Sequence, residues 1–486
     1  MPQQTFTSII IGSGFSGLAM AIKLKEKGIQ DFIVLEKAGD IGGTWRENTY
    51  PGAECDIPSA LYSYSFEPYP HWEYKWSMQP QILKYIHYVV DKYKLRHHIQ
   101  FNQEFKSAEW DGDNAQWILK TKSGESFVSK TIISAIGQLH HPSMPRIDGM
   151  ADFQGDSWHS AKWNHNISLE NKTVGVIGNA ASAVQFIPEI AKVAKQVTIF
   201  QRSANWMLPK QDRAYNNWEK KLVARLPFIL KLYRLKLWLL GGALFTLMKT
   251  GNNYLRNIYE KKTINYIKEH ITDPAIVKSL IPTYPFGAKR ALFSDTYYAA
   301  LAKENVTLVS GGLEKINTLS VSSNNNTEHP IDILIYATGF ITNPFLLGID
   351  IKGKNGLKLA DHWKDGPKNY LGISVDQFPN LFMMYGPNTN LGHNSIILMS
   401  EAQANYIAQC IKLLDDTKWN SIEVKVDVID KHHHETQERL ENMIWASIDK
   451  SWYKSEGGNI PNNYPGRTME YQQKTKKVNF DDYDLS

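Results

Sequence analysis

Two glycine-rich turns, each between a strand-like apolar run and a helix-like run, constrain the fold of this chain more than any other feature. The first turn carries Gly12, Gly14 and Gly17 in the GxGxxG spacing. Glycines there let the backbone turn tightly and approach a pyrophosphate, whose charge the following helix N-terminus stabilises. Ordinary turns also match this spacing, but the flanking strand and helix favour dinucleotide binding.

The residue 24 positions after the first glycine predicts which dinucleotide each turn binds. Glu36 ends the strand-like run FIVLE. Its carboxylate can accept both hydroxyls of an adenosine ribose and repels a 2′-phosphate, so the first turn predicts FAD or NAD. Arg202 and Ser203 stand at the corresponding place after Gly178. A guanidinium and a hydroxyl suit a 2′-phosphate, so the second turn favours NADPH over NADH.

The second turn departs from the glycine rule. Ala180 stands where the middle glycine belongs, between Asn179 and Ser182, which we also expect to contact the nucleotide. A methyl group facing the pyrophosphate is expected to push the nucleotide outward and weaken its binding. The alternative interpretation is a Rossmann-like unit that binds nothing.

Length, charge and cysteine usage exclude several classes of protein. A chain of 486 residues exceeds a single ordinary core, which predicts two or three domains. The 54 basic and 49 acidic residues include no basic tract of the kind that nucleic-acid binding requires. Cys55 and Cys410 are the only cysteines. They predict a reducing, cytoplasmic location, and the absence of a CxxC pair argues against a dithiol reductase.

We expect an α/β fold with two Rossmann-like dinucleotide-binding domains and a helical insertion. The apolar run before the first turn has no cationic segment ahead of it, so it predicts a core strand and not a signal peptide. The expected parts are residues 1–139 for the first half of an FAD domain, 140–165 for a linker, 166–341 for an NADPH domain interrupted by helices at about 212–282, and 342–486 for the rest of the FAD domain.

A basic and apolar stretch lies inside the expected insertion. Residues 237–248 carry no charge, but these 12 residues are too few for a bilayer span of about 20. The basic residues before them are Lys220, Lys221, Arg225, Lys231, Arg234 and Lys236. A helix lying on an anionic membrane is one interpretation. A helical excursion packed on the second nucleotide domain is the favoured one.

Three longer motifs resemble the signatures of type I Baeyer-Villiger monooxygenases. Residues 153–164, FQGDSWHSAKWN, fit the FxGxxxHxxxW fingerprint, and residues 42–56, GGTWRENTYPGAECD, fit GxWxxxx(F/Y)PGxxxD. Residues 283–290, TYPFGAKR, resemble the segment that carries the family's active-site lysine and arginine. The resemblance extends from the first turn to the SWY element at 451–453.

The resemblance to this family implies a reaction, its cofactors and the residues that take part in it. FAD is reduced by NADPH, dioxygen adds at flavin C4a, and the peroxide attacks a ketone to give an ester or lactone through a tetrahedral adduct. Arg290 would stabilise the anions formed, and Asp56, near the flavin, would hold that arginine. Lys289 would reach the 2′-phosphate beside Arg202. The remaining residues implied at the flavin are Gly43, Thr44, Trp45 and Tyr62.

Several alternatives stay open. Asn164 ends the fingerprint where the family usually has proline or aspartate. Broader flavin-containing monooxygenases oxidise amines and sulfides with the same two turns, and we expect some sulfide oxidation here. A nucleotide-binding sensor without activity is a further possibility. His159 is expected to act as a structural hinge, and His393 or Asn394 to touch flavin or substrate unless their loop is structural. The run His432–His434 suits no single metal ion.

Overall fold

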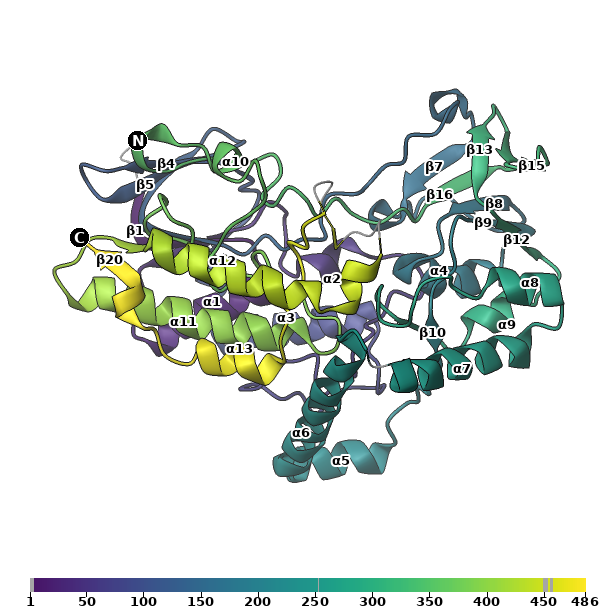
Figure 1. Cartoon of the computed structure of the whole chain (residues 1–486), viewed down its shortest axis with the longest axis horizontal. Coiled ribbons are helices and arrows are strands. Elements are labelled where there is room, and N and C mark those ends of the chain that lie inside the picture. The colour runs from purple at the N-terminus through teal and green to yellow at the C-terminus, as the bar shows by residue number, and fades with distance from the viewer. Residues whose placement is uncertain (1–3, 252, 449–452, 455–457) are drawn as a thin grey trace.

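Mostly parallel strands build the larger of two main sheets (Figure 1). The computed structural model describes residues 4–251, 253–448, 453–454 and 458–486. The strands of the larger sheet are β1 (Gln4–Ile11), β2 (Phe32–Leu35), β3 (Ile99–Gln100), β4 (Phe105–Asp111), β5 (Gln116–Thr121), β6 (Ser126–Ser134), β17 (Asp350–Lys352) and β18 (Leu381–Met383). They run in the order β17-β4-β5-β6-β1-β2-β3, with β18 also paired to β6. Only the β4-β5 and β5-β6 pairs are antiparallel among them.

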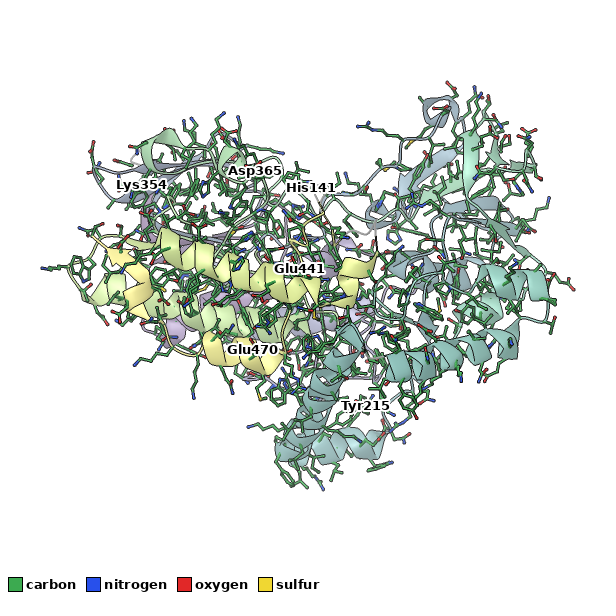
Figure 2. The ribbon with its side chains drawn as sticks, in the orientation of Figure 1. His141, Tyr215, Lys354, Asp365, Glu441 and Glu470 are labelled. Carbon is green, nitrogen blue, oxygen red and sulfur yellow. The ribbon has the colours of Figure 1, made fainter. Side chains whose placement is uncertain are left out.

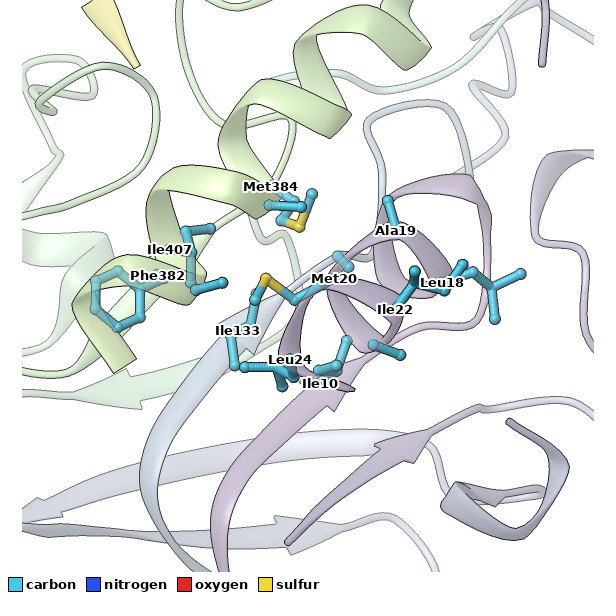
Figure 3. Close-up of a cluster of buried hydrophobic side chains, with 14 of the residues drawn as sticks. Ile10, Leu18, Ala19, Met20, Ile22, Leu24, Ile133, Phe382, Met384 and Ile407 are labelled. Atoms are coloured by element: carbon cyan, nitrogen blue, oxygen red, sulfur yellow. The ribbon is translucent and has the colours of Figure 1, made fainter. Parts of the chain in front are cut away.

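The larger of the two apolar clusters in this first unit lies between the sheet and the helices on one of its faces. Helix α1 (Phe15–Glu26) follows the first glycine turn and packs along α11 (Ile396–Asp416). Ile10 and Ile133 of the sheet meet Met20 of α1 and Ile407 of α11 in a buried cluster (Figure 3). Since α11 comes from the C-terminal part of the chain, residues far apart in sequence complete one apolar core.

The second main sheet is entirely parallel, as alternating strands and helices predict. Its order is β12-β9-β8-β16-β7. The strands are β7 (Asp156–His159), β8 (Thr173–Ile177), β9 (Gln196–Gln201), β12 (Val306–Ser310) and β16 (Ile333–Tyr336). Helix α4 (Ala181–Ile190) follows the second glycine turn, and α9 (Tyr297–Leu301) packs on it. The predicted α/β fold with two Rossmann-like units is confirmed.

The smaller elements complete the layers. The chain enters the second sheet at β7 and leaves it after β16, so the segment 140–165 contributes a strand to that sheet. The boundaries near 139, 166 and 342 remain our proposed division. The remaining strands are β10 (Met207–Leu208), β11 (Leu292–Phe293), β13 (Leu313–Ile316), β14 (Ser320–Ser323), β15 (Glu328–Pro330), β19 (Ile422–Val424) and β20 (Tyr483–Leu485). The remaining helices outside residues 212–282 are α2 (Thr44–Glu47), α3 (Gln79–Lys92), α10 (Leu359–His362), α12 (Val426–Glu441) and α13 (Thr468–Lys474).

The described part of residues 212–282 carries four α-helices, which pack in different places. They are α5 (Asn217–Arg225), α6 (Pro227–Leu244), α7 (Asn253–His270) and α8 (Pro274–Ser279). Helix α7 packs on β10 and α9, beside the second sheet. Helix α6 instead contacts loops of the first unit, because Arg234 donates to the carbonyls of Ala60 and Leu61. The expectation that the whole excursion packs on the second nucleotide domain is therefore wrong for α6.

Candidate active site

A cavity of about 1600 Å³ joins the two glycine turns. The predicted site residues that line it are Gly12, Gly14, Glu36, Gly43, Thr44, Trp45, Asp56, Tyr62, Gly178, Asn179, Ala180, Ser182, Arg202, Ser203, Lys289 and Arg290. Its volume exceeds the roughly 300–1,000 Å³ of a site for one drug-sized ligand. His141, where the two lobes meet in Figure 2, also lines it. The cavity is therefore larger than one such ligand needs, and both glycine turns line it.

The first turn has the geometry that a pyrophosphate requires. Gly12 has φ +102°, and a Cβ there would lie 2.8 Å from the Ala135 carbonyl oxygen. Gly17 lies behind the cavity wall, where a Cβ would lie 1.9 Å from the carbonyl oxygen of Gly12. Helix α1 consequently sits directly against the turn. No side chain caps its N-terminus, so its first amides are available to an anion at Gly14.

Glu36 is a buried, ionised acceptor at the end of β2. Its carboxylate accepts from the Ser13 amide at 2.9 Å, the Ser13 hydroxyl at 2.6 Å and Nη1 of Arg46 at 2.9 Å. Burial by itself would raise the pKa of Glu36, but these donors hold it below its usual value. The amide of Ala38 also donates to it. A ribose hydroxyl would replace the Ser13 hydroxyl or the Arg46 guanidinium, the two donors on rotatable side chains.

The second turn has the same backbone conformation as the first, with alanine at two of the three glycine positions. Gly178 again has φ +102°, and a Cβ there would lie 2.5 Å from the Ala337 carbonyl oxygen. Ala180 has φ −85° and ψ −164°, close to the −81° and −173° of Gly14, so alanine adopts this backbone without strain. Its exposed methyl group lines the cavity. Ala183, which sequence reasoning did not single out, takes the place of the third glycine and is fully buried.

Ala180→Gly is expected to lower the KM for NADPH by roughly two- to fivefold and to leave kcat unchanged, since the phosphate can approach the α4 amides more closely. Steady-state kinetics with NADPH varied at saturating oxygen measures this. The melting temperature of the variant controls for the added backbone freedom, which costs about 0.5–1 kcal/mol at most in a helix. An unchanged or higher KM would show that the methyl group does not hinder the nucleotide.

Two cations, Arg202 and Lys289, lie beside the second turn in the cavity wall. Lys289 places Nζ 4.5 Å from the centre of the Tyr284 ring. Burial and the nearby charge of Arg202 both lower the pKa of Lys289. Among the described residues, no carboxylate forms an ion pair with either cation. Two basic groups that repel one another, with the hydroxyl of Ser203 on the same wall, suit a doubly charged phosphate.

Asp56 and Arg290 form a bidentate ion pair in the cavity wall. Nε of Arg290 donates to Oδ2 at 2.7 Å, and Nη2 donates to Oδ1 at 2.5 Å. The charge of Asp56 raises the pKa of Arg290 above its already high ordinary value, so the guanidinium keeps its charge. Among the described residues, none accepts a hydrogen bond from Nη1. The pair thus fixes a permanent positive group that retains a donor for another oxygen.

The segment that carries Asp56 also ties the two units together. The Tyr50 hydroxyl donates to Oε1 of Gln185 on α4 at 2.9 Å, and Gln185 donates to the Glu54 carbonyl at 2.9 Å. A Cβ on Gly52 would lie 2.5 Å from the Gln185 carbonyl oxygen, so only glycine permits this approach. The YPGxxxD motif is therefore a contact between the first unit and α4 that delivers Asp56 to Arg290.

Part of the cavity wall is formed by two aromatic side chains that contact each other. Nε1 of Trp45 donates to the Tyr62 hydroxyl at 3.1 Å, and their rings meet edge to face. Burial raises the pKa of Tyr62 well above its usual value. Both side chains line the cavity. A neutral, water-poor wall of this kind strengthens the electrostatic effect of the Arg290 charge.

The fingerprint motif lies outside the cavity. Residues 156–159 form β7, the edge strand of the second sheet, and Gly155 leaves no room for a Cβ beside the Asp332 carbonyl oxygen. His159 is buried, accepts from the Ala161 amide at 3.1 Å and lies against Phe340. Asn164 accepts from the Asn166 amide at 3.0 Å in a turn that an aspartate could also make. The proposed hinge role of His159 stays a prediction.

Sequence reasoning did not predict three residues of the cavity wall. Tyr385, Asn390 and Lys454 line the cavity, and the Tyr385 hydroxyl donates to Oδ1 of Asn390 at 2.7 Å. The charge of Arg290 acts on Tyr385, although burial raises the pKa of this tyrosine overall. The GPN loop that follows Tyr385 was the available signal. Of the element at 451–453, only Tyr453 belongs to the described residues.

The histidines singled out in the sequence lie elsewhere. Asn394 lines the cavity, whereas His393 turns into the interior against Phe245. Burial lowers the pKa of His393 to about 4, so its ring is neutral. The residues His432–His434 lie on α12. In the described part of the chain, no group of three His, Cys, Asp or Glu side chains is arranged to hold a metal ion.

Fold and site together define a two-dinucleotide flavoprotein oxidoreductase. A family model described as pyridine nucleotide-disulphide oxidoreductase matches residues 9–223. A Baeyer-Villiger monooxygenase of Pseudomonas aeruginosa is 36% identical, with 98% of this chain and 91% of that protein covered. The chain belongs to the Baeyer-Villiger monooxygenases and is an enzyme.

Solved structures of the family superpose on the whole chain. OTEMO in complex with FAD and NADP has a TM-score of 0.89 and 25% identity, with 99% of each chain covered. The closed structure of cyclohexanone monooxygenase has a TM-score of 0.88 and 26% identity, covering 100% of this chain and 99% of that one. The disulphide chemistry named in the family model's description has no counterpart here, because Cys55 and Cys410 are free and buried.

Proposed function

We propose that this enzyme uses FAD and NADPH to insert one atom of dioxygen beside the carbonyl of a ketone, giving an ester or lactone. FAD supplies the activation of oxygen once NADPH has reduced it. The observation that carries the proposal is the Asp56–Arg290 pair in a cavity lined by both glycine turns. Cyclohexanone monooxygenase, whose structure this chain resembles, carries a ketone in its name.

Each residue has a role that its contacts support. Arg290 donates from its remaining edge to the oxygen on which negative charge develops, and Asp56 fixes the orientation of the guanidinium. Arg202, Ser203 and Lys289 bind the 2′-phosphate and hold the nicotinamide half in the cavity. The carboxylate of Glu36 binds the adenosine ribose of FAD.

The flavin is held at its other end by the α2 region. Gly43 and Thr44 line this part of the cavity and would contact the flavin, while Trp45 and Tyr62 would keep water away from the reacting oxygen. Sulfide oxidation as a side activity stays a prediction. So does the cytoplasmic location, with which the two free, buried thiols are compatible.

Product analysis tests this proposal against heteroatom oxidation. Purified yellow protein is incubated with NADPH and a panel of cyclic ketones, aryl ketones, aryl sulfides and tertiary amines, and products are identified by mass spectrometry. Esters or lactones from at least one ketone are expected, with NADPH consumed in parallel. Sulfoxides or N-oxides alone, with no ketone turnover across the panel, would assign the chain to heteroatom oxidation instead.

A further inference from the structure

Four large apolar side chains form an exposed stripe along α6. Phe228 is 55% exposed, Leu232 59%, Leu235 48% and Leu239 58%. Their spacing of four, three and four residues places them on one face of the helix. Soluble chains seldom leave such a contiguous apolar row uncovered, so this face of α6 is expected to be an interaction site.

The opposite face of α6 already packs on the protein. Leu230, Arg234 and Gly241 are its buried residues. Nη1 of Arg234 donates to the Ala60 carbonyl at 2.9 Å, and a Cβ on Gly241 would lie 2.8 Å from the Asn394 side chain. These contacts fix the helix through the loops that border the catalytic cavity. The apolar stripe is therefore held outward.

Basic residues flank the stripe on both sides. At 3.6 residues per turn, Lys231 and Lys236 lie about 60° to 80° to either side of it. The preceding helix α5 adds exposed Trp218 and Leu222, together with Lys220, Lys221 and Arg225. The only acid in residues 214–251 is Glu219, which pairs with Arg213 at 2.6 Å. No described carboxylate forms an ion pair with Lys220, Lys221, Arg225, Lys231 or Lys236.

We propose that helices α5 and α6 dock the protein on the surface of an anionic lipid bilayer, with α6 lying in the plane of the interface. The two helices project from the body of the molecule beyond Tyr215 (Figures 1 and 2). Leucines and a phenylalanine would enter the acyl boundary while the flanking lysines meet anionic headgroups. None of the described helices is both long and apolar enough to cross a bilayer, so the contact is peripheral.

This docking goes beyond the proposed function and does not depend on it. An apolar row without basic flanks would suit a second protein chain equally well. Here the cations flank the apolar row and none of them is ion-paired with a described carboxylate, which is the charge pattern that anionic headgroups complement. The inner face of the same helix contacts Asn394, which lines the cavity, so a docked membrane would lie beside the catalytic unit.

Co-sedimentation of the flavin-loaded protein with lipid vesicles tests the proposal. Binding is expected to vesicles of phosphatidylcholine mixed with phosphatidylglycerol and not to phosphatidylcholine alone. The triple variant L232Q/L235Q/L239Q should lower the partition coefficient by at least roughly 100-fold, because it removes most of the buried apolar area. The variant K231Q/K236Q should lower it by roughly 25-fold, since each basic residue near an anionic surface contributes about fivefold.

Matched control variants distinguish binding through the α6 face from nonspecific binding of the protein surface to vesicles. V193Q/L319Q/M469Q replaces three exposed apolar residues elsewhere, and K476Q/K477Q removes two exposed lysines elsewhere. Both should bind anionic vesicles like the parent protein, and flavin content and melting temperature confirm that every variant is folded. The proposal is overturned if the α6 variants bind like the parent. It is equally overturned if the parent protein does not bind the vesicles and instead forms a dimer that is dissociated in the L232Q/L235Q/L239Q variant.

Discussion

Replacing Arg290 by alanine is expected to reduce formation of the oxygenated product by roughly 10²–10³-fold, because one preorganised donor to a developing oxyanion contributes that much. The variant also leaves Asp56 without its partner, an uncompensated charge in the cavity wall that adds to the loss. NADPH-driven bleaching of the flavin should continue at a similar rate. Product yield and flavin absorbance, measured on the same sample, separate the two effects.

Arg439→Ala is the matched control for that variant. Arg439 forms a bidentate pair with Glu470, and its side chain is 38% exposed, the same fraction as Arg290, but it lies outside the cavity. This variant should make product normally. Ketone oxygenation by Arg290→Ala at nearly the parent rate would remove Arg290 from the mechanism. Loss of flavin from the same variant would show that its role is structural.

The double variant R202A/K289A is expected to lose roughly 100-fold or more in kcat/KM for NADPH and to change little with NADH. Each charge-assisted contact to the 2′-phosphate contributes about 1.5–3 kcal/mol, and only NADPH carries that group. Each single variant removes one of the two contacts to the 2′-phosphate, so it should lose roughly half of the total in free energy. Steady-state kinetics with both nucleotides measures the specificity ratio.

The control for this pair is K172A/K195A, which removes two exposed cations from the same unit but outside the cavity. It should keep the parent's preference for NADPH. If R202A/K289A kept the parent's NADPH to NADH ratio, the second turn would recognise its nucleotide by other groups, and the assignment of the 2′-phosphate site would fail.

Local patterns made the fold and the two turns predictable. Gly12, Glu36 and Gly178 act through the backbone and the strand end next to them, so sequence spacing alone locates them, and the fold class is confirmed. The Asp56–Arg290 contact joins residues 234 positions apart. No periodicity reaches that far, and only the resemblance to a family brought the two together before the structure did.

The sequence did not predict which side chains face the protein interior or the cavity, because tertiary packing determines their orientation. The apolar and basic residues of α6 predict an amphipathic helix, but only the Arg234 contacts with Ala60 and Leu61 show which face packs on the protein. Tyr385 lies just before the GPN loop, a signal that predicts a turn but does not show that this tyrosine lines the cavity. His393 and Asn394 are adjacent in the sequence, but the first side chain packs against Phe245 and the second lines the cavity. The surrounding side chains determine this difference, and sequence spacing does not predict it.

The most direct test of the central claim is the fate of oxygen in a ketone assay under ¹⁸O₂. The yellow enzyme, NADPH and a ketone that it accepts should give an ester or lactone in which each molecule carries a single ¹⁸O atom. Product without the label would contradict the account, as would an enzyme that binds no flavin or one that consumes NADPH with every ketone tested and never forms an ester.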